Sequence, residues 1–435
     1  MYLRIKKIIN SDREIISKLI KTFLTRGLSA IGTLVFHVVL ARLMGVDEYG
    51  IFVIAYSLII GASLFAKFGM TSAILRFSSI MFKNREFGKI LKLKRDVTYL
   101  TFFVSIIFSI LISSNTESIS VLFFDGIDVK YLLFVFSISL PFYSFLTIQS
   151  SFLKSFSRPE IAPLFEIGLM VLFTAFFTFI YSLFFDIVTS FNSSIFFLIS
   201  CFFIFLSGNY TIKKVLINQI GYKKNNYEKY QGFYSTLFSF GLSNLSSYFL
   251  KFSPILLLGY YFTSTEVSYY SIANNSAFLI NFVLWIVSSV YAPYFANLFK
   301  ENKIAELNKL LIRATIYMLI IAVPVFLIIV IFPNFILSIF DPNFSGSTSP
   351  LLILAFAQLV NVATGPVLFL MNMIGREKEL MIIIMITSIL TIVLGLILVP
   401  KYSYHGAAIS TAIGLITQNI IAVYKSKKYI KIMKN

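Results

Sequence analysis

The sequence has few charged residues and few residues of the kinds that build catalytic or metal centres. Only 13% of its 435 residues are charged, with one cysteine and two histidines, whereas soluble domains have roughly a quarter charged residues. Cys201 lies inside an apolar run, so no intramolecular disulfide can form. A glycine-rich phosphate loop, an H-E-x-x-H motif and a metal-spaced Cys/His cluster are all missing. We therefore expect no enzyme, no cofactor, no metal and no nucleotide-driven pump.

Apolar residues dominate what remains. They make up 58% of the chain, and the mean hydropathy is +0.86. The apolar runs do not alternate at period two as barrel strands would. We predict an all-α integral membrane protein with about twelve transmembrane helices, each near the ~20 residues needed to cross a bilayer. The expected spans are 22–44, 49–75, 97–114, 131–153, 161–185, 194–212, 233–262, 267–298, 315–337, 350–373, 380–399 and 406–424.

The basic residues indicate how the chain lies in the membrane. A net charge of +18 could suggest a nucleic-acid partner, but the lysines and arginines gather in alternate loops. This is the pattern of the positive-inside rule. We therefore expect membrane lipids rather than nucleic acid as surroundings, an even number of spans and both termini in the cytoplasm. Residues 1–21 are read as an uncleaved cytoplasmic segment.

An internal repeat divides the chain. Residues 48–55 (EYGIFVIA) return 218 positions later as residues 266–273 (EVSYYSIA). The same offset pairs Leu40 with Leu258 and Arg158 with Arg376. We predict two six-helix lobes related by a parallel repeat: an N-terminal lobe at 1–212, a cytoplasmic linker at 213–232 and a C-terminal lobe at 233–435.

Polar residues inside the apolar spans are the candidate site residues. Residues seven or eleven apart share a helix face, and the first two spans of each half carry polar stripes with this spacing. A charge at mid-span costs at least about 2.5–3.5 kcal/mol, so it usually faces a water-filled cavity or a partner. The candidates for a substrate cavity between the lobes are Arg26, Lys67, Lys251, Asn244, Asn274 and Asn281.

Several candidates have a second interpretation. Arg26 lies near a span end, so its side chain could instead extend to the membrane surface. Lys251, near mid-span, could instead form a structural ion pair. His37 fits a hydrogen-bonded core histidine better than a proton carrier. Glu166 could pair with Arg158 or with a cavity cation, or it could titrate; pairing is favoured. His37 and Glu166 are the candidates for ion coupling.

Residues 29–45 and the following E-Y-G-I-F at 48–52 resemble the start of Wzx-type polysaccharide and O-antigen flippases. These belong to the multidrug/oligosaccharidyl-lipid/polysaccharide exporter (MOP) superfamily. Residues 266–270 and the basic loop after the second span also fit. The resemblance implies transport of undecaprenyl-diphosphate-linked sugar repeat units across the bacterial inner membrane. It also implies alternating access driven by an ion gradient, with H⁺ or Na⁺ as partner.

Two other functions stay open at this point. A related exporter could carry drugs or another cell-envelope lipid precursor, and a membrane polymerase or glycosyltransferase could use the same lipid carrier. An enzyme of that kind would need a sizeable exocytoplasmic loop, which the sequence lacks. An exporter of cationic drugs would show acidic residues deep in its spans. Here the deep charges are mainly basic, which suits an anionic cargo.

Overall fold

The computed structural model describes residues 2–124, 127–156, 158–220 and 232–432. Its elements in this part of the chain are all helices, which confirms the predicted class. The first half contains α1 (Tyr2–Ala66), α2 (Met70–Lys83), α3 (Phe87–Ser114), α4 (Thr116–Phe123), α5 (Lys130–Ser155), the π-helix η1 (Leu164–Gly168), α6 (Leu169–Ser182) and α7 (Ser190–Ile220). The second contains α8 (Phe233–Tyr261), α9 (Ser264–Lys300), α10 (Ile304–Ile331), α11 (Pro333–Ser338), the 3₁₀-helix η2 (Pro342–Ser347), α12 (Thr348–Ala363), α13 (Val367–Met373) and α14 (Glu377–Ile432).

Two of these helices are long enough to cross a membrane twice. Their apolar segments, Leu24–Ala66 and Glu377–Lys428, are 43 and 52 residues long, about twice what one crossing needs. Each bends at a residue in a positive-φ conformation, Gly45 (φ 77°) and Ser403 (φ 50°). The bend at Gly45 is the turn that the sequence predicts between its first two spans. The described residues contain eight candidate spans, and counting these two twice gives ten. Helices α8 and α9, 29 and 37 residues long, bring the number to the predicted twelve.

The internal repeat is visible in the backbone. Helices α3 and α10 are both 28 residues long and start 217 positions apart, at Phe87 and Ile304. The residues before them have nearly identical backbone angles: φ −84°, ψ 62° at Glu86 and φ −85°, ψ 62° at Lys303. Helices α5 and α12 start 218 positions apart. The first half has a break between α1 and α2, whereas α9 is continuous.

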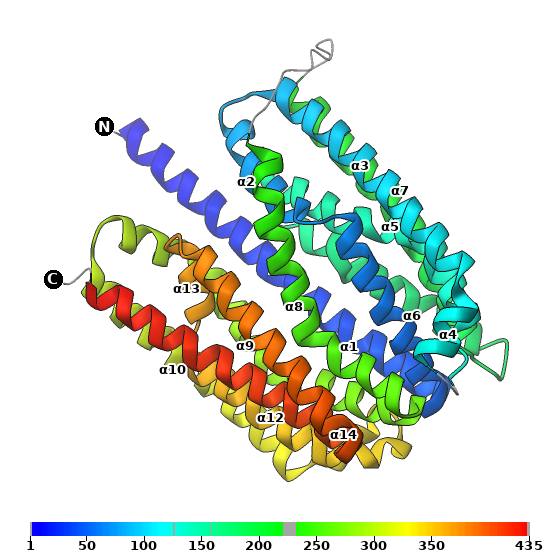
Figure 1. Cartoon of the computed structure of the whole chain (residues 1–435). Helices are drawn as coiled ribbons and strands as arrows, with labels where there is room; N and C mark the ends of the chain where they lie inside the picture. Colours follow the sequence, from blue (N-terminus) through cyan, green and yellow to red (C-terminus); the bar gives the residue numbers. More distant parts are fainter. Residues whose placement is uncertain (1, 125–126, 157, 221–231, 433–435) are drawn as a thin grey trace.

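The two halves form two lobes. Figure 1 shows α2–α7 on one side and α9–α14 on the other, with α1 and α8 passing between them. The chain termini lie at the same end of the bundle, called here the terminal end. The opposite end, with the Gly45 bend and the α8–α9 turn, is called the hairpin end. Helix α7 continues into the predicted 213–232 linker as far as Ile220, and 221–231 lie outside the described residues. The lobe boundaries therefore stay a prediction.

The lobes meet at the hairpin end on the repeat axis. Asp47 and Thr265, equivalent residues 218 apart, are joined by a side-chain hydrogen bond. Equivalent residues can touch only near the axis that relates the halves. The hydroxyl of Ser268 donates to the carbonyl of Val46. A Cβ at Gly50 would lie 2.0 Å from the carbonyl oxygen of Ser264, so glycine is needed for this approach. The structure is therefore closed at the hairpin end.

Candidate functional site

A cavity separates α1 from α9 next to the closed hairpin end. Its volume is about 130 Å³, and its wall is mostly apolar. Thr33 and His37 contribute from α1, and Asn275, Phe278 and Phe282 from α9. Since the two helices come from different lobes, this cavity lies at the lobe interface. Further toward the terminal end, a Cβ at Gly27 would have nothing within 4 Å, so this face of α1 is free of close neighbours.

A hydrogen-bonded chain closes the hairpin side of the cavity. The hydroxyl of the buried Tyr49 lies 2.8 Å from Nδ1 of His37, and Nδ2 of Asn275 donates to the same hydroxyl at 3.4 Å. The Tyr49 ring also packs edge-on against Phe344, with 6.2 Å between centroids. His37 is thus the hydrogen-bonded core histidine that the sequence favours, and it also faces the cavity.

Lys251 does not line the cavity, but it acts electrostatically on His37, which does. Lys251 lies on α8, and its side chain is exposed. Its Nζ lies 5.1 Å from the centroid of the Phe252 ring, within cation–π range. The structure therefore brings together Lys251 from the C-terminal lobe and His37 from the N-terminal lobe.

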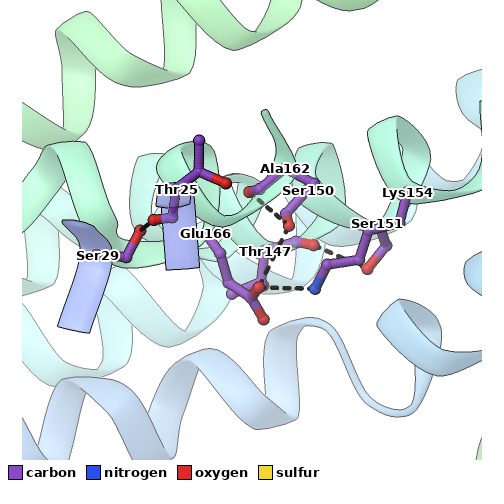
Figure 2. Close-up of polar contacts among 8 residues, drawn as sticks. All are labelled: Thr25, Ser29, Thr147, Ser150, Ser151, Lys154, Ala162 and Glu166. Atoms are coloured by element: carbon purple, nitrogen blue, oxygen red, sulfur yellow. Dashed lines mark hydrogen bonds and ion pairs between the residues drawn. The ribbon is translucent and has the colours of Figure 1, made fainter. Parts of the chain in front are cut away.

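A second polar site lies within the N-terminal lobe. The ammonium of Lys154 is 2.7 Å from Oε2 of Glu166, and the hydroxyl of Ser150 donates to the same oxygen at 3.4 Å. Figure 2 shows both side chains reaching from α5 toward Glu166. Lys67 also acts electrostatically on Glu166, and its Nζ lies 5.4 Å from the centroid of Tyr143. We call Lys67, Lys154 and Glu166 the N-lobe charge cluster.

The position of Glu166 depends on an irregular helix. It lies on η1, a single π-helical turn before α6; such turns often occur at functional sites. Gly168 at the end of η1 packs closely on α1, because a Cβ there would lie 2.3 Å from Oγ of Ser29. Ser29 donates to the carbonyl of Thr25, one turn earlier (Figure 2). The charge cluster is thus packed directly against the first span.

The partner of Glu166 differs from the residue named in the sequence prediction. Arg158 pairs with Glu160 at 3.3 Å instead, and Glu166 pairs with Lys154. The predicted span 131–153 ends just before Lys154, whereas in the structure Lys154 lies in the last turn of α5. It follows Tyr143, Thr147 and Ser150 at helical spacing, so all four share one face. This polar stripe on α5 was the available sequence signal.

A cluster of buried amides lies in the C-terminal lobe. Asn361 lies 218 positions after Tyr143 and donates to Asn281 at 3.1 Å and to Gln358 at 3.3 Å. Asn281 is buried with these partners on α12, and it does not line the described cavity between α1 and α9. By the 218-residue offset Asn281, Gln358 and Asn361 correspond to Ser63, Leu140 and Tyr143, so the amide cluster and the N-lobe charge cluster occupy different positions of the repeat.

The remaining candidates lie around these two sites. Asn275 rather than the adjacent Asn274 lines the cavity, because one helical step turns a side chain by about 100°. Arg26 is half-buried on α1, one turn before the cavity-lining Ala30. Asn244 is half-buried on α8. The predicted cavity cations thus divide between two surroundings: Lys251 lies beside His37, and Lys67 lies in the N-lobe charge cluster.

Comparisons with solved structures show the same fold in MOP superfamily transporters. A multidrug resistance MATE family transporter in an inward-facing conformation matches with TM-score 0.70 and 15% identity, over 95% of each chain. The lipid II flippase MurJ in an inward closed conformation matches with TM-score 0.67 and 20% identity, over 95% of this chain and 87% of MurJ. A MOP superfamily transporter from Pyrococcus furiosus matches with TM-score 0.64 and 16% identity, over 97% and 96%.

Sequence comparison identifies the family. No curated protein matches the chain significantly. The family model described as "Polysaccharide biosynthesis protein" matches residues 39–349, well over half of the chain. The matched region includes the hairpin-end contacts, Lys67, the Lys154–Glu166 pair and Lys251. The chain therefore belongs to the polysaccharide biosynthesis protein family and has the fold of the MOP superfamily transporters.

Proposed function

We propose that the protein is a flippase. It moves undecaprenyl-diphosphate-linked oligosaccharide repeat units across the bacterial inner membrane by alternating access. The observation that carries this proposal is the interface cavity with Lys251 near its lining residue His37, in a chain of the polysaccharide biosynthesis family. A diphosphate is anionic and too polar to cross hydrocarbon unaided, and an accessible cation offsets the hydration that it loses.

The apolar cavity wall suits the lipid part of such a cargo. Ile31 and Phe278 both line the cavity, and their side chains are 57% and 41% exposed. The cavity is therefore open between α1 and α9 rather than sealed. A prenyl chain would rest against these side chains, while the charged headgroup would move past Lys251 toward the N-lobe charge cluster.

The orientation follows from the loop charges. The terminal end, with the basic loops, faces the cytoplasm, and the hairpin end faces outward. A molecule closed at the hairpin end is then closed to the outside and would accept cargo from the cytoplasmic leaflet. Both termini are cytoplasmic in this proposal, and Ser345 on η2 faces the outside.

An ion gradient is the proposed energy source, with H⁺ or Na⁺ as the coupling ion. Glu166 and His37 are the ionisable groups proposed for coupling to protons. Glu166→Gln should then weaken transport that is driven by a pH gradient in proteoliposomes. Transport that responds to the gradient unchanged in this variant would remove Glu166 from the coupling step.

The alternative is an exporter of drugs or of another envelope lipid precursor. Multidrug transporters share the fold, so the fold does not separate the two functions. The charge at the sites favours the flippase, since Lys251 and the N-lobe charge cluster suit an anionic headgroup. Resistance to cationic drugs that depends on this gene, with surface glycan unaffected by its deletion, would favour the alternative.

The proposal is tested by complementation of a deletion strain, with surface glycan as the readout. Lys251→Glu should abolish export of the lipid-linked glycan, because it places a negative charge beside the phosphate path. Lys251→Arg should retain partial activity, since the positive charge remains. Membrane abundance of each variant is checked by immunoblot. Normal surface glycan in an abundant Lys251→Glu protein would refute the proposed role of this lysine.

A further inference from the structure

The N-lobe charge cluster contains two lysines and one carboxylate, and only one of the lysines is ion-paired to it. Lys154 makes the direct ion pair with Glu166, and Lys67 attracts the same carboxylate electrostatically. The pair is reachable, because its side chains are 23% and 41% exposed, whereas Lys67 is only 6% exposed. The three groups together have a net positive charge, so the cluster favours an anion with more charge than one carboxylate.

We propose that Glu166 is an internal counter-anion which the cargo displaces. It holds Lys154 when the transporter is empty, and the diphosphate replaces it on Lys154, while the buried Lys67 adds electrostatic attraction from behind. This inference rests on the proposed function and makes the N-lobe charge cluster the diphosphate subsite. Glu166 then serves as a residue that sets affinity rather than as a ligand of the cargo.

Exchange of one anion for another explains how a charged site can release its cargo. An unpaired ammonium inside a membrane protein is costly, and Glu166 compensates Lys154 while the site is empty. The diphosphate must separate this pair before it binds, so its net affinity stays moderate. The displaced carboxylate is the more exposed partner of the pair, so it can leave Lys154 without moving into the protein interior.

The surroundings of Glu166 are suited to such movement. It lies on the π-helical turn η1, whose wider turn departs from regular α-helical hydrogen bonding. Besides Lys154, its contact with Ser150 is long, at 3.4 Å, while the same hydroxyl donates to the carbonyl of Ala162 at 2.9 Å. Ser150 therefore keeps a partner when Glu166 leaves.

The test is the binding of undecaprenyl diphosphate to the purified full-length protein. Glu166→Gln should bind at least about tenfold more tightly than wild type, because a nearby like charge is removed. Lys154→Gln should bind more weakly, and the double variant should fall between the single variants. Undecaprenol, which has no phosphate, should bind equally to all of them. The matched control is Glu117→Gln, which breaks the exposed Glu117–Lys130 pair (3.1 Å) at the hairpin end and should not change binding.

The outcomes separate the inference from the proposed function. Tighter binding by Glu166→Gln, with slower transport in liposomes, supports displacement. An intact Glu166→Gln protein that binds the diphosphate as wild type does, or more weakly, overturns it. If the glutamine variant does not fold, Glu166→Ala is judged by the same criterion. If wild type binds undecaprenyl diphosphate but Glu166→Gln does not bind it more tightly, only the inference is contradicted. If neither wild type nor any variant binds it, the proposed function is contradicted as well.

Discussion

Gly50 lies where the two halves of the chain cross at the hairpin end. Any Cβ there would meet the backbone of the α8–α9 turn, with 2.0 Å to the carbonyl oxygen of Ser264. Backbone cannot move aside as a flexible side chain can. The missing side chain therefore permits the close approach of the lobes, and the equivalent residue in the second half, Ser268, donates its hydroxyl to the carbonyl of Val46.

We predict that Gly50→Ala destabilises the structure closed at the hairpin end by about 1–3 kcal/mol, the usual range for overpacking. The melting temperature of the purified protein in detergent should fall. Gly27→Ala is the matched control, since it is a glycine of the same helix with nothing within 4 Å of its Cβ position. It should be neutral or slightly stabilising. Equal melting temperatures for Gly50→Ala and Gly27→Ala would contradict the close approach.

Tyr49 offers a second prediction at the residue scale. Its hydroxyl joins His37 of the N-terminal lobe to Asn275 of the C-terminal lobe. Tyr49→Phe should leave these polar groups without that partner and cost about 1–3 kcal/mol, the usual penalty for a buried group left unsatisfied. Thermal unfolding measures the loss. Tyr131→Phe, at an exposed ring on α5, should not change the melting temperature. Similar losses of stability in both variants would mean that the hydrogen bonds of the Tyr49 hydroxyl do not stabilise the protein.

Single residues also show what the sequence could and could not predict. Lys251 and His37 were found because a charge or an imidazole inside an apolar run is visible in the sequence. The Lys154–Glu166 pair was missed because Lys154 lies near a span end, where a basic residue also fits a loop. The sequence predicts Asn274 rather than Asn275 at the cavity, because the direction in which an amide points depends on helix packing that the sequence does not specify.

At the scale of elements, the turns of the two hairpins form one contact. Asp47 follows the Gly45 bend, and Thr265 begins α9; these equivalent residues are hydrogen-bonded. The repeat predicts that the turns correspond, since both contain the same motif. It does not predict that they touch, because contact depends on the closed state of the lobes. The sequence does not predict the break between α1 and α2 either, because residues 49–75 have the composition of a single span.

This contact can be locked. Asp47→Cys with Thr265→Cys should form a disulfide under mild oxidation and stop transport, because the hairpin end must open to release cargo outward. Reductant should restore transport. The native Cys201 is buried in α7, and Cys201→Ser removes it from the assay. Each single cysteine variant is the control. Full transport by a completely cross-linked protein would show that the hairpin end does not gate the cargo.

At the scale of the whole molecule, most of the predicted architecture follows from the lengths of the apolar runs and from the internal repeat. The bilayer requires spans of ~20 residues, and the 218-residue repeat requires two similar halves, so fold class and symmetry could be derived from the sequence. The difference between the lobes could not. The N-terminal lobe holds charges around Tyr143, and the C-terminal lobe holds amides around Asn361. That asymmetry arises from side chains on three helices and becomes visible only when the helices are placed together.

The proposed orientation gives a prediction for the whole chain. In a Cys201→Ser background, a cysteine at Lys427 on α14 should be labelled only from the cytoplasm, and one at Ser345 on η2 only from outside. The sequence makes the same prediction for a cytoplasmic cysteine at Lys223, which lies outside the described residues. A membrane-impermeant maleimide applied to intact and permeabilised cells measures this. Labelling of Lys427→Cys in intact cells would reverse the orientation.

Flipping by the purified protein tests the central claim most directly. The protein is reconstituted into liposomes with an undecaprenyl-diphosphate-linked oligosaccharide, and an ion gradient is applied. A membrane-impermeant sugar-modifying reagent then reports the fraction of headgroups in the outer leaflet over time. The account predicts net, gradient-dependent movement in wild-type liposomes, movement at background rates with Lys251→Glu, and no movement of a cationic drug. Equal rates in wild-type, Lys251→Glu and protein-free liposomes would contradict it.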